Sequence, residues 1–270
     1  MAQTKTWRMD AAGAEIYEKV RVPGEFEQLA RMLLDRVGPK RGQTVLDVAC
    51  GTGIVARLAA ERVGESGHVT GVDRDSAMLA VARANAPRAC APLVWHVGDA
   101  LALPFAAGAF DVVLCQQGLQ FFPNRLGALR EMKRVLAPDG RFGTCLWRSS
   151  DYDPFSIAAS EALARHVSRE AAEQATYAYG DAGELRALIE AAGFREAEVS
   201  PLTVSRRMGP PSESIPLFFA SSGRLSRIYA SLEPGVRAAV VADISRSVLS
   251  YVSGNGMEIP RETLIATARY

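Results

Sequence analysis

The residue types most able to bind a ligand stand in residues 45–53, which read VLDVACGTG. This stretch predicts an apolar strand that ends on the carboxylate of Asp47, then a turn through Gly51 and Gly53 into a helix. A glycine turn between a strand and a helix lets a ligand approach bare backbone at the carboxyl end of a parallel sheet. Twenty residues past Gly53, a second strand ends on Asp73, an acid placed to accept from a ribose diol. The pattern indicates a nucleoside ligand.

The elements that must position these residues alternate between apolar strands and helices. We expect strands at 44–48, 68–72, 93–97, 110–115 and 141–147, separated by helices at 53–63, 75–86 and 124–136. Near-continuous apolar strands with helical crossovers are typical of a parallel sheet buried on both faces. The core of the chain is therefore predicted to be a doubly wound α/β layer.

The two ends of the chain depart from this alternation. Residues 11–37 predict two helices broken at Pro23-Gly24. Beyond residue 147 the pattern predicts helices at 154–168 and 181–192, a strand at 195–208, a helical insertion over 211–253 and a last strand at 258–268. We therefore expect seven strands, mostly parallel with the last antiparallel, flanked by helices. The expected division is 1–40 (N-terminal helices that close over the ligand), 41–150 (binding core) and 151–270 (the rest of the sheet, with a helical cap from 150–180 and 211–253).

Composition narrows the class of protein. The 270 residues are 48% apolar and 23% charged, the balance of a globular protein, and the formal charge of +1 argues against nucleic acid as a partner. No apolar run reaches the length of a membrane span, and residues 1–8 lack the apolar core of a secretory signal. The four cysteines and three histidines show no metal-ligand spacing, so we expect reduced thiols, no metal and a cytoplasmic location.

Five sequence pieces fall in an order and spacing that resemble a known family. They are Asp47–Gly53, Gly71-Val72-Asp73, residues 98–105 (GDALALPF), residues 110–113 (FDVV) and residues 134–140 (RVLAPDG). Together they resemble the class I S-adenosylmethionine-dependent methyltransferases, and within these the small-molecule branch that includes the ubiquinone- and menaquinone-biosynthesis enzymes. The resemblance is good over residues 10–150 and weak beyond. It implies a Rossmann-like fold, S-adenosylmethionine as cofactor and S-adenosylhomocysteine as product.

The resemblance also implies a set of cofactor contacts. The Gly51-Thr52-Gly53 turn, with Ala49 before it, would face the methionine carboxylate, and Asp47 would accept from the cofactor ammonium. Asp73 would hold the ribose. The remaining contacts implied are Gly98, Asp99 and Ala100 for the adenine edge, Arg74 and Met78 for its faces, Gln116 for the methionyl end, and Tyr17 as the tyrosine that closes over the cofactor.

The methyl acceptor is less well specified by the sequence. Aromatic residues in and near the expected cap suggest a small apolar or aromatic acceptor, methylated on O, N or C, and a quinone precursor and a natural product are both consistent. Candidate acceptor contacts are Phe121, Tyr152, Phe155, Tyr179, Phe218 and Phe219, and weak candidates for catalysis are His166, Gln117, Gln120 and Tyr177. A mobile cap that sets acceptor choice is our expectation, and the competing interpretation is a homodimer interface formed by the same residues.

Two other functions fit parts of the sequence. Residues 51–56 also satisfy the loose glycine pattern of NAD(P)-dependent oxidoreductases, with an acid about twenty residues on. Against that function, Asp47 would place a carboxylate beside a pyrophosphate, and residues 98–99 would have no role. The second alternative is a homologue that binds the cofactor but transfers nothing.

Overall fold

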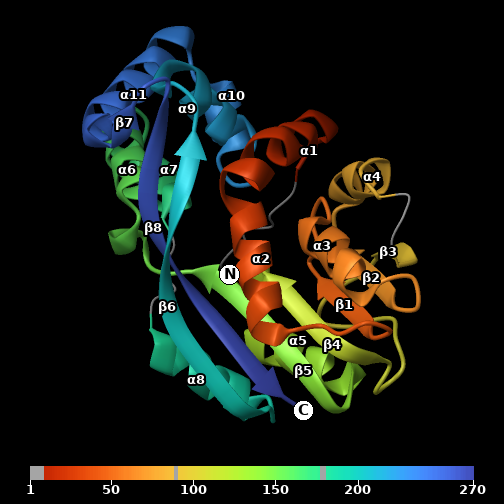
Figure 1. The fold of residues 1–270 in the computed structure, drawn as a ribbon. Helices are drawn as coiled ribbons and strands as arrows, with labels where there is room; N and C mark the ends of the chain where they lie inside the picture. The colour runs from red at the N-terminus through yellow and green to blue at the C-terminus, as the bar shows by residue number, and fades with distance from the viewer. Residues whose placement is uncertain (1–8, 88–90, 177–180) are drawn as a thin grey trace. The chain divides into compact units, whose positions relative to one another are not determined.

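The computed structural model describes residues 9–87, 91–176 and 181–270 (Figure 1). The chain forms two compact units, each built from separate stretches of sequence. The first, called here the sheet unit, comprises residues 26–146, 181–202 and 264–270. The second, called the helical unit, comprises residues 1–25, 147–180 and 203–263.

A mixed sheet organises the sheet unit. Its strand order is β3-β2-β1-β4-β5-β8-β6, and the two-residue strand β7 pairs with β8. Strands β1 to β5 pair in parallel, whereas β8 runs antiparallel, and Figure 1 draws the arrowheads of β6 and β8 in opposite directions. The strands are β1 (Thr44–Val48), β2 (His68–Asp73), β3 (Leu93–Val97), β4 (Phe110–Gln116), β5 (Leu136–Trp147), β6 (Arg195–Met208), β7 (Val252–Ser253) and β8 (Gly256–Arg269). Because β1 lies between β2 and β4, its carboxyl end is at the centre of the parallel part.

In the described part of the sheet unit, the helices that flank this sheet are α2 (Glu27–Val37), α3 (Ile54–Val63), α4 (Ser76–Ala84), α5 (Arg125–Val135) and α8 (Ala182–Ala191). Helix α3 packs on β1, β2 and β3, α2 packs on α3 and β4, and α5 packs with α8. The helix ends follow from their capping residues. Asp75 accepts from the Ala77 N–H at the start of α4, and Gly38, with φ +64°, ends α2 in the left-handed conformation.

The expected break at Pro23-Gly24 is wrong. Residues Tyr17–Phe26 form a π-helix that contains Pro23 and joins α1 (Ala11–Ile16) to α2 without interruption. A proline lacks the N–H donor and its ring collides with the carbonyl of the preceding α-helical turn. The wider π-helical turn relieves that collision, so the chain accommodates Pro23 by changing helix type rather than by ending the helix.

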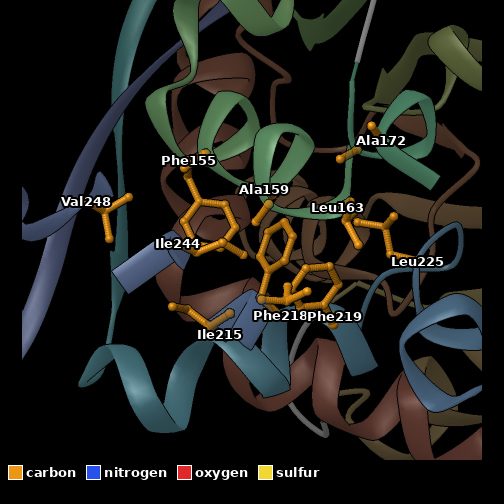
Figure 2. Packing of buried hydrophobic residues seen from close by; sticks show 14 of the residues in the cluster. Phe155, Ala159, Leu163, Ala172, Ile215, Phe218, Phe219, Leu225, Ile244 and Val248 are labelled. Atoms are coloured by element: carbon orange, nitrogen blue, oxygen red, sulfur yellow. The ribbon is translucent and has the colours of Figure 1, made fainter. Parts of the chain in front are cut away.

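The helical unit has an apolar core of its own. Its longer helices are α6 (Pro154–His166), α7 (Arg169–Ala175), α9 (Pro211–Ala220), α10 (Ser226–Ser231) and α11 (Pro234–Ser247), and α6 packs on both α7 and α11. Figure 2 shows the rings of Phe155, Phe218 and Phe219 gathered at the centre of this core, with Ile215 and Leu163 beside them. Phe155 and Phe219 are completely buried.

The expected elements recur with shifted limits. Strand β5 begins at Leu136 rather than at 141. The helix expected at 154–168 is α6, which ends at His166, and the sequence did not indicate the helix that follows it, α7, where Ser168 accepts from the Ala171 N–H (3.1 Å). Over the described residues the sheet has eight strands rather than seven, because of β7. The two compact units divide between residues 25 and 26, and α2 packs within the sheet unit. The functional division expected at residue 40 stays a prediction. The segments 150–180 and 211–253 both fall in the helical unit.

Candidate cofactor site

The carboxylate of Asp47 lies at the carboxyl end of the central strand β1 and is 1% exposed. Its Oδ2 accepts from the Ala56 N–H in the first turn of α3 (3.1 Å). Its Oδ1 is buried and has no hydrogen-bond partner. Burial raises the pKa of Asp47 to about 8, and the nearby charge of Asp73 adds to the rise. The charge of Arg57 partly opposes the rise, but in the described chain it forms no ion pair with Asp47. A buried carboxyl group with an unpaired oxygen is suited to receive a cationic ligand.

The turn that follows β1 depends on left-handed backbone. Ala49, Gly51 and Gly53 have φ values of +57°, +55° and +87°. A Cβ atom on Gly53 would lie 2.3 Å from Cη2 of Trp95, and one on Gly51 would lie 3.2 Å from Cε of Met78. The protein's own packing therefore requires glycine at position 53 independently of a ligand, which the sequence did not indicate. Trp95 also approaches Gly71, where a Cβ would lie 2.5 Å from its ring.

Asp73, at the end of β2, is held from both sides by backbone. Its Oδ2 accepts from the Gly51 N–H (2.8 Å) and its Oδ1 from the Asp75 N–H (2.8 Å). Burial raises the pKa of Asp73, although these two hydrogen bonds oppose the rise. Each oxygen keeps a second lone pair, so the carboxylate is fixed in place and can still accept from two hydroxyl groups.

The loop after β3 presents a third carboxylate. Asp99 is exposed and its Oδ1 accepts from the Leu101 N–H (2.9 Å), which shapes the loop. The neighbouring Ala100 is buried, and a Cβ on Gly98 would lie 2.8 Å from Cγ2 of Val72. Asp99 thus shapes its loop, and its second oxygen is available for an amine donor.

The end of β4 brings Gln116 beside this group of residues. Its Nε2 donates to the carbonyl of Phe26 (3.1 Å), while its Oε1 is buried without a partner. The next residue, Gln117, has a left-handed backbone (φ +56°), and its side chain is buried 3.9 Å from Sγ of Cys145. A Cβ on Gly118 would lie 2.7 Å from Cβ of Ala49, so the turns that follow β4 and β1 pack together.

Three buried side-chain oxygens at the ends of β1 and β4 and in the turn after β1 have no hydrogen-bond partner among the described residues: Asp47 Oδ1, Thr52 Oγ1 and Gln116 Oε1. Leaving a buried polar atom unpaired costs about 1–3 kcal/mol. Because these oxygens accept hydrogen bonds, the arrangement fits a ligand that carries N–H or O–H donors, as the aminoacyl part of S-adenosylmethionine does.

Comparison with known proteins identifies the family. Residues 45–140 match the family described as "Methyltransferase domain". Over 273 positions the chain is 32% identical to nocamycin O-methyltransferase of Saccharothrix syringae, a match that covers 96% of this chain and 94% of that protein. The chain belongs to the S-adenosylmethionine-dependent methyltransferases.

Further similarities agree with this assignment. The methyltransferase is 37% identical over 182 residues to 2-phytyl-1,4-naphtoquinone methyltransferase of Synechococcus elongatus, covering 62% of this chain and 78% of that one. Its fold is similar to that of phosphoethanolamine N-methyltransferase 2 of Haemonchus contortus in complex with S-adenosyl-L-methionine. That likeness has a TM-score of 0.61 at 21% identity and covers 96% of this chain and 57% of that one. Family membership, rather than a nicotinamide cofactor, accounts for the glycine turn.

The other residues expected at the sites of the methyltransferase differ in their exposure to solvent. Arg74 is exposed, and Met78 is 1% exposed with its methyl group near Gly51. Phe121, expected as an acceptor contact, and Gln120, a weak candidate for catalysis, are half-buried in the 3₁₀ turn Leu119–Phe121, and both roles stay predictions. Tyr17 is half-buried in the helical unit at the start of the π-helix, so its closure over the cofactor stays a prediction.

Most of the expected acceptor contacts lie in the helical unit of the methyltransferase. Phe155, Phe218 and Phe219 form its core, with the rings of Phe155 and Phe218 4.6 Å apart. Their first role is therefore packing, and contact with an acceptor stays a prediction. Tyr152 is exposed and stacks on the guanidinium of Arg148 at 3.6 Å. Tyr177 and Tyr179 lie outside the described residues.

His166 has a structural partner in the methyltransferase. Its Nε2 lies 2.8 Å from Oδ2 of Asp243, and Arg165 and Arg246 pair with the same carboxylate. These contacts tie the end of α6 to α11 within the helical unit. A catalytic role for His166 stays a prediction. Within the described parts of the chain, no group of His, Cys, Asp or Glu side chains is arranged to hold a metal ion.

Sequence reasoning missed two features of the methyltransferase. Trp95 packs against Gly53 and Gly71, which places it beneath the glycine turn. The second is a group of four buried charged side chains in the helical unit, called here the charge ring, in which each arginine pairs with both carboxylates: Glu25, Asp153, Arg206 and Arg261. Strand alternation could have indicated two of these. Arg206 shares a strand face with Val204, and Arg261 shares one with Ile259, both buried apolar residues.

Proposed function

We propose that this methyltransferase transfers the methyl group of S-adenosylmethionine to an oxygen atom of a small apolar or aromatic molecule of the natural-product type. The support for oxygen is the match to nocamycin O-methyltransferase, which extends over 94% of that protein, including the stretches outside the methyltransferase core. The quinone relative matches over a shorter part of the chain. An acceptor of the quinone-precursor type, methylated on carbon, is the second candidate.

We further propose which residues hold the cofactor. Asp73 accepts from the ribose hydroxyls, Asp99 from the adenine amine, and the Ala100 N–H donates to the adenine ring. The N–H groups of the turn at Gly51–Gly53, at the start of α3, face the methionine carboxylate. The observation that carries the proposal is the set of unpaired buried oxygens beside this turn, with Asp47 and Gln116 left to accept from the cofactor's ammonium end. Arg74, Met78, Gly98 and Ala49 complete the proposed set.

The chemistry needs little from the protein beyond alignment. Bound S-adenosylmethionine supplies a methyl group already activated by its sulfonium, for direct in-line displacement by the acceptor oxygen. The chain's residues fix the orientation of both reactants and exclude water, since proximity and alignment account for much of the rate. A general base is required only where the acceptor is protonated at the working pH.

The cofactor site is tested by calorimetry with S-adenosylhomocysteine and, separately, NAD. We expect S-adenosylhomocysteine to bind and NAD not to bind. Asp73→Ala should weaken the binding of S-adenosylhomocysteine by about 2 kcal/mol or more, because charge-assisted hydrogen bonds are lost. Asp111→Ala is the matched control. That carboxylate accepts from the Thr44 N–H and hydroxyl (both 2.8 Å) at the other end of the same sheet. Unchanged affinity in folded Asp73→Ala would remove Asp73 from the site.

The acceptor is tested with methyl-labelled S-adenosylmethionine and a panel of phenols, enols and naphthoquinols, followed by mass spectrometry of the product. Methyl transfer to oxygen supports the proposal, and transfer to a ring carbon favours the quinone-precursor candidate. No transfer to any acceptor, together with intact cofactor binding, would favour a homologue that binds the cofactor without catalysis.

We also propose a cytoplasmic location and leave a homodimer through residues 150–180 and 211–253 as the competing role for the helical unit. Among the described residues, no helix is long and apolar enough to cross a membrane. Size-exclusion chromatography with light scattering measures the oligomeric state directly.

A further inference from the structure

The loop that carries the proposed adenine contacts comprises residues 98–105, between β3 and β4 of the sheet unit. Its first residue donates its N–H to the carbonyl of Asp73 (3.0 Å), which ties the start of the loop to the end of β2. The side chain of Asp99 accepts from the Leu101 N–H (2.9 Å), a bond within the loop itself. That bond shapes the loop but does not fix its far end to the rest of the unit.

Two side chains of α5 hold the far end of this loop. Glu131 accepts through Oε2 from the Leu103 N–H (2.9 Å). Arg134 donates through Nη2 to the carbonyl of Leu103 (3.0 Å) and through Nη1 to the carbonyl of Phe105 (2.8 Å). Three backbone groups of the loop are therefore bound by one helix of the same unit. We call Glu131 and Arg134 the loop clamp.

The clamp is itself held in one geometry. Arg134 donates from Nε to Oε1 and from Nη2 to Oε2 of Glu131, both at 2.8 Å, which is the parallel two-bond arrangement of a guanidinium with a carboxylate. The hydrogen bond from Arg134 lowers the pKa of Glu131, and the bond from the Leu103 N–H adds to the lowering. The two side chains are 37% and 22% exposed, and so exposed an ion pair contributes little to folding stability. Its main effect is therefore on the position of the backbone that it binds.

The clamped end of the loop is connected directly to Asp99. Asp99 and Ala102 form an antiparallel bridge across the loop, in which the Ala102 N–H donates to the Asp99 carbonyl (3.0 Å). Ala102 precedes Leu103, whose N–H and carbonyl are both bound by the clamp. A shift of Leu103 would therefore move Ala102 and, through it, the backbone of Asp99 and Ala100.

The clamp also gives a role to parts of the sequence that the proposed cofactor contacts leave without one. Residues 110–113 and 134–140 are two of the five pieces that carry the family resemblance. Phe110 begins the first of these pieces and Arg134 begins the second. Both contact the end of the loop at Phe105: the Phe110 ring lies edge-on to its ring (5.1 Å), and Arg134 donates to its carbonyl. The two pieces thus share one partner, the loop beside the proposed adenine site.

We propose that Arg134, held by Glu131, is a positioning residue for adenine recognition: it fixes the far end of the loop, so that the Asp99 carboxylate and the Ala100 N–H stay within reach of the adenine edge. The inference rests on the proposed function, which assigns these two contacts to adenine. Asp99 is exposed and its side chain bonds to its own loop, so the position of the carboxylate depends on what holds the loop. A loop released at its far end would weaken the hydrogen bond to the adenine amine.

The first experiment measures how well the protein recognises the adenine amine. Calorimetry gives its affinity for S-adenosylhomocysteine and for the purine analogue of that molecule, which lacks the 6-amino group. The unmodified protein should bind S-adenosylhomocysteine roughly ten-fold more tightly, the effect of one charge-assisted hydrogen bond. Arg134→Lys keeps the charge but loses the two-bond fork, so the preference should fall to roughly two-fold. An unchanged preference in the folded variant overturns the inference.

The second experiment asks whether Arg134 acts through Asp99. Arg134→Lys should lower the affinity for S-adenosylhomocysteine roughly five-fold in the unmodified background. In the Asp99→Ala background the same substitution should lower it by no more than about two-fold, because residues that act through one another are not additive. Equal losses in both backgrounds would mean that the clamp only stabilises the fold, and would overturn the inference.

Kinetic measurements distinguish cofactor binding from the reaction itself. The transferred methyl group lies at the other end of the cofactor from adenine. With the phenolic acceptor that the unmodified protein methylates fastest, Arg134→Lys should therefore raise the KM for S-adenosylmethionine roughly five-fold and leave kcat within about two-fold. A fall in kcat at unchanged KM would place the effect at the reacting end of the cofactor and would overturn the inference.

The matched control is Arg31→Lys. Arg31 pairs with Glu27, one turn earlier on the exposed side of α2, in the same unit as the clamp. The substitution should change neither the preference for the amine nor the KM. Thermal unfolding is recorded for each variant. If Arg134→Lys does not fold, Glu131→Ala, which removes the acceptor of the Leu103 N–H, replaces it with the same expected results.

The outcomes separate this inference from the proposed function. If the unmodified protein does not bind S-adenosylhomocysteine, the proposed function fails. If it binds S-adenosylhomocysteine and the purine analogue equally, the contact assigned to Asp99 fails, and this inference fails with it. If it prefers S-adenosylhomocysteine and Arg134→Lys behaves like the control, only this inference fails.

Discussion

The two units bury their carboxylates in opposite ways. In the helical unit, Glu25 and Asp153 are surrounded by arginines, and both pKa values are lowered despite complete burial. In the sheet unit, Asp47 and Asp73 form no ion pair in the described chain, and burial raises both pKa values. All four are carboxyl groups and all four are buried, so the difference lies in the arginine partners.

This comparison separates structural from ligand-binding acids. A buried carboxylate with a full set of arginine partners has nothing left to offer a ligand, and its charge serves to hold chain segments together. A buried carboxylate held only by backbone N–H groups keeps an unmet charge that a cationic or hydroxyl-bearing ligand can satisfy. The difference in counter-ions therefore supports the proposal that the sheet unit binds the cofactor.

The largest effect is expected from breaking the charge ring. Asp153→Ala removes one member and leaves Arg206 with a single carboxylate, so we expect a loss of about 3–5 kcal/mol in the free energy of unfolding, measured with urea. Asp153 also caps α6, which adds to the loss. Glu262→Gln should lower the free energy of unfolding by less than about 1 kcal/mol, because the ion pair between Glu262 and Arg148 is partly exposed. A loss below 1 kcal/mol for Asp153→Ala would show that the ring contributes little.

The comparison also predicts opposite pH dependence from the two units. Asp47 has a pKa of about 8 in the folded protein against 3.8 in the unfolded chain. Its contribution to the free energy of unfolding is therefore fully present below pH 3.8 and is lost as the pH rises toward 8. Glu25 has a folded pKa of about 2 against 4.5, so its contribution is present above pH 4.5 and is lost as pH falls toward 2. Each slope can reach about 1.4 kcal/mol per pH unit.

Urea unfolding of Asp47→Asn and Glu25→Gln across this pH range measures both slopes. Relative to the unmodified protein, Asp47→Asn should gain stability steadily from pH 4 to 8, while the stability lost in Glu25→Gln should shrink in acid. Curves that run parallel to that of the unmodified protein would mean that these carboxyl groups titrate normally in the folded state.

The smallest expected effect is the release of a proton from Asp47 when the cofactor binds. If the cofactor's ammonium lies near Asp47, it favours the charged carboxylate, and binding at pH 7 should release up to about one proton per cofactor. Calorimetry in two buffers with different ionisation enthalpies measures this release. Asp47→Asn should release none. A heat of binding that is independent of buffer would place the ammonium away from Asp47.

The sheet unit could be predicted from sequence because its signals are local. Apolar strands, a glycine turn and strand-end acids each occupy a few adjacent residues, and β1, β3 and the ends of α3 and α4 lie within two residues of their expected positions. Family membership confirms the cofactor that these signals indicated. The residue contacts proposed for it stay predictions, and so does the acceptor.

The helical unit could not be predicted in the same way because its determinants are distant in sequence. The charge ring joins residues from the π-helix, the N-cap of α6, β6 and β8. Strand alternation places its two arginines on buried faces, but no local signal indicates which distant carboxylates pair with them. Phe218 and Phe219 were expected to contact an acceptor, since an aromatic pair after a proline-rich turn gives the same signal in a core and in a pocket. Only the packing partners distinguish the two.

Trp95 links positions that the sequence presents as independent. Its ring occupies the space that a side chain would need at Gly53 and at Gly71. A replacement at either glycine would therefore collide with the indole. The three positions should therefore vary together among homologues. A lineage that reduces Trp95 to a smaller residue first gains room for alanine at position 71. Position 53, with φ +87°, stays constrained by its backbone, so the order in which these substitutions can accumulate is itself determined by the fold.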